Sequence, residues 1–225
     1  MRADVMLDRI VDEVGRFVGA TTRRFLIGHS GGAQFVHRYV MAHPAKVERY
    51  VVSAAGWYTL PDPTLPFPAG TGRIAELPDL TFDAAAFLAV PGCACVGSRD
   101  IGRGAAVKKS LSVDRDQGMT RLERARRWSA AMNQAALARG LPGPISFRVL
   151  PEAAHRFSGM VRRGGLAEIA FAFLFAATDR RSLRLWQWHE NWVDSFDSEV
   201  TPSAPPGRGF PASSAAALAP TERQR

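Results

Sequence analysis

The stretch from Phe25 to Gly32 holds the residues of this sequence that are best suited to chemistry. Its last five residues, 28–32, fit G-x-S-x-G, the nucleophile elbow, in which a sharp turn between a strand and a helix exposes a serine hydroxyl. Glycines suit both flanks because the turn is strained and neighbouring backbone passes closely. Apolar residues before the turn, and at helical spacing after it, predict this strand and this helix. The alternative is a glycine-rich turn between strand and helix in which Ser30 has no catalytic role.

Two other side chains have the chemistry to activate a serine. Asp100 follows the apolar run 92–96, and His155 lies in the loop that follows Ile145–Leu150. A serine hydroxyl is a poor nucleophile until a base takes its proton, and a histidine can do this and later protonate the leaving group. An aspartate can hold the imidazole in one tautomer and stabilise the imidazolium. We therefore expect Ser30, Asp100 and His155 to form a catalytic triad, although an aspartate after a strand is often only a turn former.

These side chains need elements that bring them together, and the hydrophobic pattern predicts strands alternating with helices. The expected strands are 25–27, 47–54, 92–96 and 145–150, and the expected helices include 3–18, 122–136 and 166–178. This alternation predicts an α/β fold with an open, mostly parallel sheet and flanking helices. Sites in such sheets lie outside the carboxyl ends of the strands, where all three residues fall. Asp62, after the second strand, is the alternative acid.

With a serine, an acid and a histidine in this order, the sequence resembles the α/β-hydrolase fold superfamily from about residue 5 to residue 178. Residues 28–43 look like the elbow and its helix, 96–100 like the strand end that presents the acid, and 150–157 like the histidine loop. Among subgroups, the sequence is similar to bacterial esterases related to polyhydroxyalkanoate depolymerases and feruloyl esterases, on residues 31–35 and 55–58. The resemblance implies a serine esterase that forms an acyl-enzyme intermediate with a small or oligomeric ester substrate.

The resemblance also implies further site residues. The backbone N–H of Gly31, at the start of the helix, would donate to the oxyanion. His29, at the variable position of the elbow, and Phe157, at the end of the histidine loop, would lie beside the substrate. Trp57 and Tyr58 stand at the mouth of a proline-rich excursion, about 56–91, that would shape the pocket. Ordinary packing is the alternative for these two aromatic residues.

The chain departs from the complete fold at its N-terminal side. Only 29 residues precede Ser30, which gives room for one helix and one strand, so the N-terminal half of the sheet is expected to be absent. The second oxyanion donor of the fold comes from that half. The Ser30 strand would become an edge with unpaired backbone groups, able to pair with a second copy or a partner strand. The chain is then either part of a full esterase, or a weakened hydrolase or non-catalytic binding module.

Composition indicates one globular domain. The sequence has 225 residues, of which 46% are hydrophobic, and it has no apolar run of the roughly 18 residues that would span a membrane. We expect a hydrolase domain at 1–181, a Trp-rich C-terminal extension at 182–200, and a disordered tail at 201–225, where Pro, Ala, Ser and Arg dominate. No internal repeat is visible.

Charge and cysteine usage argue against several other classes of protein. The net charge of +8 comes from scattered arginines, and the densest run, 121–127, lies within a helical pattern. We expect it to be a solvated helix face, and we expect neither a nucleic-acid nor a membrane partner. Cys93 and Cys95 lack the spacing of a disulfide or a zinc site, and residues 28–32 lack the lysine of a phosphate-binding loop. No metal or cofactor is expected, and the compartment is expected to be the cytoplasm unless a signal precedes Met1.

Overall fold

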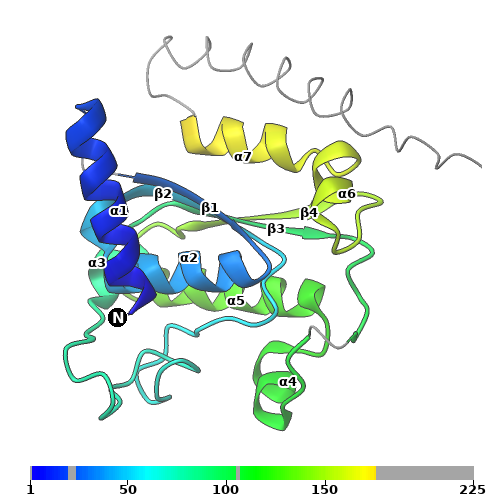
Figure 1. The fold of residues 1–225 in the computed structure, drawn as a ribbon. Helices are drawn as coiled ribbons and strands as arrows, with labels where there is room; N and C mark the ends of the chain where they lie inside the picture. Colours follow the sequence, from blue (N-terminus) through cyan, green and yellow to red (C-terminus); the bar gives the residue numbers. More distant parts are fainter. Residues whose placement is uncertain (1, 20–23, 105–106, 176–225) are drawn as a thin grey trace, which may run out of the picture. The chain divides into compact units, whose positions relative to one another are not determined.

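The computed structural model describes residues 2–19, 24–104 and 107–175, and in it strands alternate with helices (Figure 1). The strands are β1 (Arg24–His29), β2 (Val47–Ser53), β3 (Gly92–Gly97) and β4 (Ile145–Leu150). The α-helices are α1 (Ala3–Val18), α2 (Gly31–Ala42), α3 (Ala84–Leu88), α4 (Leu111–Gln117), α5 (Arg121–Leu137), α6 (Phe157–Arg162) and α7 (Leu166–Phe175), and a 3-10 helix, η1, covers Pro44–Lys46. The expected extension at 182–200 and tail at 201–225 lie outside the described residues.

The four strands form one parallel sheet in the order β1-β2-β3-β4. His29 pairs with Ser53, Ser53 pairs with Cys95, and Gly97 pairs with Leu150. This register brings the carboxyl ends of all four strands to the same side of the sheet. The expected parallel α/β architecture is confirmed, and among the described strands β1 occupies one edge, as expected.

Helices cover both faces of the sheet (Figure 1). One face packs against α2, α3 and α5, with Val52 and Ala94 pointing toward them. The other packs against α6 and α7, with Val51 and Cys93 pointing that way. Strands that are buried on both faces need apolar residues at successive positions, which explains why their sequences show short apolar runs rather than clean alternation.

The two cysteines of β3 lie on the α7 face of the sheet. Both side chains are buried, and Cys93 Sγ is 3.7 Å from Cys95 Sγ, too far for a disulfide bond. They pack as small core residues. Within the described part of the chain, no helix is long and apolar enough to cross a membrane.

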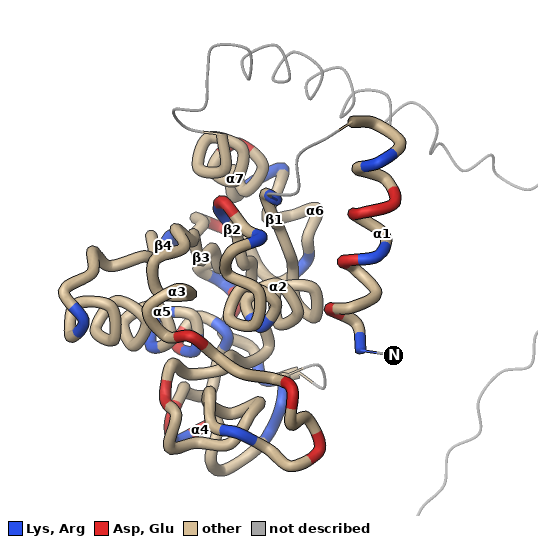
Figure 2. The backbone as a smooth tube through the Cα atoms, turned by 90° about the vertical axis from the view of Figure 1, so that its left-hand side faces the viewer, with Lys and Arg blue, Asp and Glu red and all other residues tan. Residues whose placement is uncertain are grey.

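Helix α1 packs less deeply than its amphipathic sequence predicts. Leu7 contacts the α2 side of the core. Several other apolar side chains of the helix are half-exposed or more: Met6, Ile10, Val14, Phe17 and Val18. Figure 2 shows the helix beside the rest of the sheet domain, with acidic and basic positions interspersed along it.

Polar contacts hold α1 to the neighbouring elements. The carboxylate of Asp8 accepts three hydrogen bonds, from Arg24, Tyr39 and Lys46. Burial opposes the charge of this carboxylate, but these hydrogen bonds outweigh it and hold the pKa of Asp8 well below its usual range. At the start of the helix, Asp4 Oδ2 lies 2.8 Å from His43 Nε2.

Candidate active site

Ser30 occupies a strained turn between β1 and α2. Its backbone has φ +53° and ψ −113°, a combination that residues with a side chain rarely adopt. Gly28 makes the turn possible, because a Cβ at this position would press against the carbonyl oxygen of Gly32. The amide of Ser30 donates to the Ser53 carbonyl at 2.8 Å, which ties the turn to β2. The serine is thereby held at the carboxyl end of the sheet.

The structure brings together the three residues that sequence analysis grouped. His155 Nε2 lies 3.1 Å from Ser30 Oγ, and His155 Nδ1 lies 2.9 Å from Asp100 Oδ2. The Asp100 side chain is 3% exposed and that of His155 is 32% exposed. A buried carboxylate therefore faces one nitrogen of an imidazole whose other nitrogen faces the serine hydroxyl.

The loops after β3 and β4 are fastened to each other, which fixes the distance between Asp100 and His155. The amide of Ser98 donates to the Leu150 carbonyl at 2.8 Å, and the amide of Arg99 donates to the Ala153 carbonyl at 2.9 Å. Gly97 allows this approach, because a Cβ there would collide with the Ala153 carbonyl. The acid and the base are thus positioned by backbone contacts between two adjacent strand ends.

Arg121, on α5, is a contact of the site that sequence analysis missed. Its Nη1 lies 3.2 Å from Asp100 Oδ1, the carboxylate oxygen that does not face His155. The expectation that run 121–127 is a solvated face is wrong for Arg121 and Arg124, which are 4% and 0% exposed. Helical spacing could have shown this, because both share a face with the buried Trp128. Arg126 and Arg127 are exposed, as expected.

Arg124 organises the loops around the site. Its guanidinium donates to the carbonyls of Gly118, Gly56 and Lys108 and to the carboxylate of Asp114. Gly56 follows β2 and Lys108 follows β3, so one buried cation joins α5 to the loops after two strands. Burial lowers the pKa of Arg124, and the carboxylate of Asp114 opposes that change.

Three other expected site residues lie beside Ser30 and His155. Gly31 begins α2, so its amide N–H has no partner within the helix and is free to donate. The His29 ring stacks on the His155 ring with centroids 5.0 Å apart and lies 5.3 Å from the Phe157 ring. Burial, and next the charge of His155, lower the pKa of His29. The His29 ring thus flanks His155, while Phe157 is half-exposed.

The aromatic pair after β2 divides between core and surface. Tyr58 was expected at the substrate pocket, but it is fully buried and stacks on Trp128 with centroids 4.6 Å apart. Gln117 holds its backbone through a pair of 2.8 Å hydrogen bonds. Trp57 is half-buried, with Arg38 and Lys108 over its ring. Tyr58 is therefore a core residue, and only Trp57 is available to a ligand.

The alternative acid, Asp62, takes part in a local turn. Its Oδ1 accepts hydrogen bonds from the amide and the hydroxyl of Thr64 at 2.8 and 2.7 Å. Of the two candidate acids, Asp100 is therefore the one beside His155. Among the described residues, no group of three or more His, Cys, Asp or Glu side chains could hold a metal ion.

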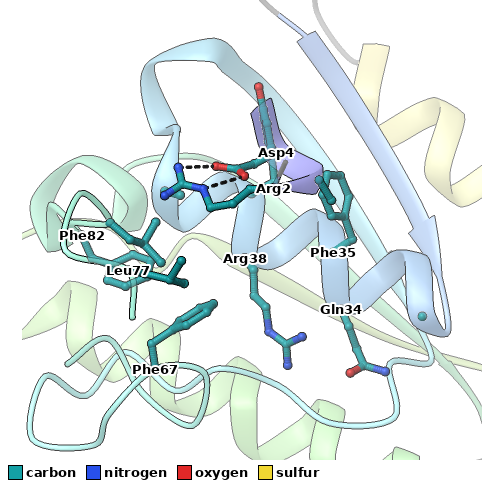
Figure 3. A pocket seen from close by; sticks show the side chains of 13 residues that line it. Arg2, Asp4, Gln34, Phe35, Arg38, Phe67, Leu77 and Phe82 are labelled. Carbon is teal, nitrogen blue, oxygen red and sulfur yellow. Dashed lines mark hydrogen bonds and ion pairs between the residues drawn. The ribbon is translucent and has the colours of Figure 1, made fainter. Parts of the chain in front are cut away.

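A cavity of about 350 Å³ lies along one side of α2 (Figure 3). It starts at Gly31, next to Ser30, and follows α2 past Gln34 and Arg38 to Ala42. The N-terminal end of α1 and the excursion after β2 form its other walls. Sequence analysis expected this excursion to shape a pocket, and the structure places four of its apolar side chains there: Phe67, Leu77, Leu80 and Phe82.

Two solved structures share this architecture. Poly(aspartic acid) hydrolase-1 from Sphingomonas sp. KT-1 has a TM-score of 0.62 and 28% identity, over 71% of this chain and 60% of that one. LpqC, a poly(3-hydroxybutyrate) depolymerase from Bordetella parapertussis, has a TM-score of 0.59 and 30% identity, over 68% and 51%. This chain spans about half to three-fifths of the length of these hydrolases. No protein-family model matches the sequence, and no curated protein matches it.

The fold implied by the sequence resemblance is confirmed. Four parallel strands with helices on both faces carry Ser30, Asp100 and His155 at their carboxyl ends, in the chain order of that fold. The same architecture occurs in the two hydrolases. The described part of this chain therefore has the α/β-hydrolase fold.

Proposed function

We propose that this chain is a serine hydrolase that cleaves carboxylic esters, with Ser30, His155 and Asp100 as its catalytic triad. The observation that carries the proposal is the continuous series of contacts from Ser30 Oγ to His155 Nε2, at 3.1 Å, and from His155 Nδ1 to Asp100 Oδ2, at 2.9 Å. In this arrangement the Nδ1–H of a neutral imidazole donates to the carboxylate. The lone pair of Nε2 is then left to accept the serine proton.

In the first half of the reaction, Ser30 Oγ attacks the ester carbonyl carbon while His155 Nε2 takes the hydroxyl proton. The carbonyl oxygen becomes an oxyanion that accepts a hydrogen bond from the Gly31 amide at the N-terminus of α2. Collapse of the tetrahedral intermediate breaks the bond to the alcohol oxygen, which leaves with the proton from His155. The products are an alcohol and an acyl-enzyme ester on Ser30.

In the second half, a water molecule attacks the acyl carbon and gives a proton to His155. That proton returns to Ser30 Oγ as the carboxylic acid is released. Asp100 stabilises the imidazolium in both halves. Arg121 limits this stabilisation, because its guanidinium binds the same carboxylate as His155. The same contact prevents the Asp100 carboxylate from rotating away from His155.

The names of the similar proteins and the partly exposed His155 support a proposal for the substrate class. Both similar proteins are named for polymers, and poly(3-hydroxybutyrate) is a polyester. The half-exposed Phe157 lies on one side of Ser30, and the cavity lined by Gly31 lies on the other. Both could contact the carbon chain of a substrate. We therefore propose a small or oligomeric ester as the substrate.

The test is covalent labelling of the purified chain with a fluorophosphonate, followed by intact-mass measurement. One adduct is expected on the wild-type chain and none on Ser30→Ala. Ser53→Ala is the matched control, because it removes a neighbouring hydroxyl outside the triad and should still be labelled. A folded wild-type chain that takes no adduct would contradict the proposal.

The position of β1 favours a second candidate, a module that binds a partner strand. Among the described strands β1 has one neighbour, and its Ile27 is 50% exposed. An exposed strand edge can pair with another strand, and a second copy of this chain offers a matching edge. Light scattering should then show a dimer that Ile27→Lys dissociates, whereas a monomer at all concentrations would refute this candidate.

A further inference from the structure

The cavity beside α2 is lined at one end by Gly31, the residue that follows the proposed nucleophile. The α2 residues that line it recur at helical spacing on one face: Gly31, Gln34, Phe35, Arg38 and Ala42. The amide of Gly31 is the proposed oxyanion donor, so one end of the cavity is where the ester carbonyl would lie. Arg38 is seven residues further along the helix, about 10 Å at 1.5 Å per residue. A substrate chain that leaves Ser30 in this direction therefore runs toward Arg38.

The walls of the cavity suit a carbon chain. Phe67, Leu77, Leu80 and Phe82 come from the excursion after β2, and the rings of Phe67 and Phe82 lie 5.5 Å apart. Figure 3 shows Phe67, Leu77 and Phe82 gathered on one side of the cavity, with Phe35, Gln34 and Arg38 extending from α2 on the other. A fully hydrated anion would gain little from such walls, whereas methylene groups would leave water on entering.

Of the two arginines that line this cavity, Arg2 is paired with Asp4, whereas Arg38 has no carboxylate partner among the described residues. Its Nε donates to Thr59 Oγ1 at 3.1 Å, and its guanidinium lies 4.5 Å from the Trp57 ring centroid. Within the described part of the chain it forms no ion pair, and its buried Nη2 has no hydrogen-bond partner. Lys108 lies over the same Trp57 ring at 3.9 Å and adds a second positive charge without an ion pair among these residues.

Asp4, the acidic residue in the cavity lining, already has hydrogen-bond partners. Asp4 accepts hydrogen bonds from Arg2 at 2.9 and 3.1 Å, and its Oδ2 lies 2.8 Å from His43 Nε2. Asp4 therefore cannot serve as the counterion of Arg38. The half-buried guanidinium of Arg38 has no counterion among the described residues and lies across an apolar cavity from the nucleophile. A carboxylate on the ligand would supply that counterion.

We infer that this cavity is a subsite for a carboxylate, and that the ester hydrolysed by the chain bears a free carboxylate at the far end of a carbon chain. Arg38 binds that carboxylate, the excursion covers the chain, and the ester carbonyl lies between Ser30 Oγ and the Gly31 amide. This inference rests on the proposed hydrolase function and names the substrate class of the same site.

The test compares two esters of equal carbon number that differ at one end. Mono-4-nitrophenyl suberate ends in a carboxylate, and 4-nitrophenyl octanoate ends in a methyl group at the same position. The wild-type chain should hydrolyse the suberate with a kcat/KM at least about tenfold higher, the gain expected from one charge-assisted contact. Arg38→Met should lower the ratio of the two kcat/KM values to about one. Equal wild-type rates, or a preference that survives Arg38→Met, would overturn the inference.

Two further variants separate the subsite from general effects of charge and folding. Lys108→Met removes a cation from the same tryptophan but does not touch the cavity, so the preference should remain. Gln34→Glu keeps Arg38 but supplies a carboxylate one helical turn away, which should occupy the guanidinium and reduce the preference. Gln34→Glu therefore tests the subsite even if Arg38→Met does not fold.

A binding measurement distinguishes failure of the subsite from failure of the catalytic proposal. Calorimetric titration of Ser30→Ala with monomethyl suberate should show binding that dimethyl suberate lacks and that Arg38→Met removes. If the wild-type chain cleaves no ester but this binding is observed, the subsite stands and the hydrolase proposal fails. If monomethyl and dimethyl suberate bind equally, the subsite is refuted whatever the activity.

Discussion

His37 should make the stability of this domain fall as the pH drops below neutral. Its ring is buried between α2 and the loop after β2, with 1% of the residue exposed. Nδ1 lies 2.8 Å from the Ala33 carbonyl oxygen and donates to it, and Nε2 accepts from the Thr59 amide at 2.9 Å. If Nε2 were protonated, its N–H would face the N–H of Thr59, and two hydrogen-bond donors would be in contact with no acceptor between them. Burial lowers the pKa of His37 from 6.5 to about 3.

The direction of this pH effect follows from the difference in the number of protons that His37 binds in the unfolded and folded chains. Between pH 6.5 and about 3 the unfolded chain holds a proton on His37 that the folded chain does not. Falling pH therefore favours the unfolded state, and the stability present above pH 6.5 is lost progressively below it. The gap between the two pKa values corresponds to about 5 kcal/mol in total, of which about 2 kcal/mol is lost between pH 7 and pH 5. A loss of that size is a large share of the stability of an ordinary domain.

Urea unfolding at pH 7, 6 and 5 measures this loss directly. His37→Gln cannot titrate, so it should be less stable at pH 7 but lose about 2 kcal/mol less than the wild-type chain on acidification to pH 5. The comparison between the two chains cancels the contribution of groups that titrate in both, including Asp4 and Asp8. Identical pH dependence in the two chains would refute the assignment of a neutral, buried His37.

Three substitutions test other parts of the site and core. Arg121→Met leaves the buried Asp100 with an uncompensated carboxylate oxygen, so it should lower the free energy of unfolding in urea by about 2–3 kcal/mol. If Arg121→Met lowers that free energy equally in an Asp100→Asn background, the two side chains do not interact. Tyr58→Phe removes a buried hydroxyl that has no hydrogen-bond partner among the described residues, so it should change stability by less than about 1 kcal/mol and leave fluorophosphonate labelling unchanged; a tenfold loss of labelling would return Tyr58 to the substrate pocket. Gly28→Ala drives a methyl group against the Gly32 carbonyl and should cost about 1–3 kcal/mol and slow labelling, and an unperturbed melting temperature would contradict the close approach.

The residues that could be predicted from sequence are those fixed by local pattern. The apolar run before Ser30, the glycines around it, and the positions of Asp100 and His155 after strands were sufficient to place all three at one side of a parallel sheet. The capping pair Thr120 and Glu123 begins α5 close to the expected start of its apolar stripe. These signals are local, since each depends on neighbours within a few residues.

The failures concern side chains whose surroundings come from distant parts of the chain. Tyr58 was placed at the pocket because it stands at the mouth of the proline-rich excursion, but Trp128, 70 positions later in the sequence, supplies a ring for it to stack on. Arg121 and Arg124 looked solvated within a charged run. Their partners are Asp100 and loop carbonyls that only the tertiary structure brings near. Helical spacing relative to Trp128 indicates which face of α5 is buried, but the acceptors of these arginines cannot be inferred from neighbouring sequence.

The attachment of α1 has a consequence for how the cavity responds to salt. Arg2, Ala3 and Asp4 of its N-terminal end form one wall of the cavity, while the helix itself is held by charged contacts through Asp4 and Asp8. Salt screens partly exposed ion pairs, so rising ionic strength should loosen this wall before the apolar core of the sheet is affected. Ligand affinity and helix docking are then linked. A ligand that fills the cavity tightens α1, and whatever releases α1 weakens the ligand by the same free energy.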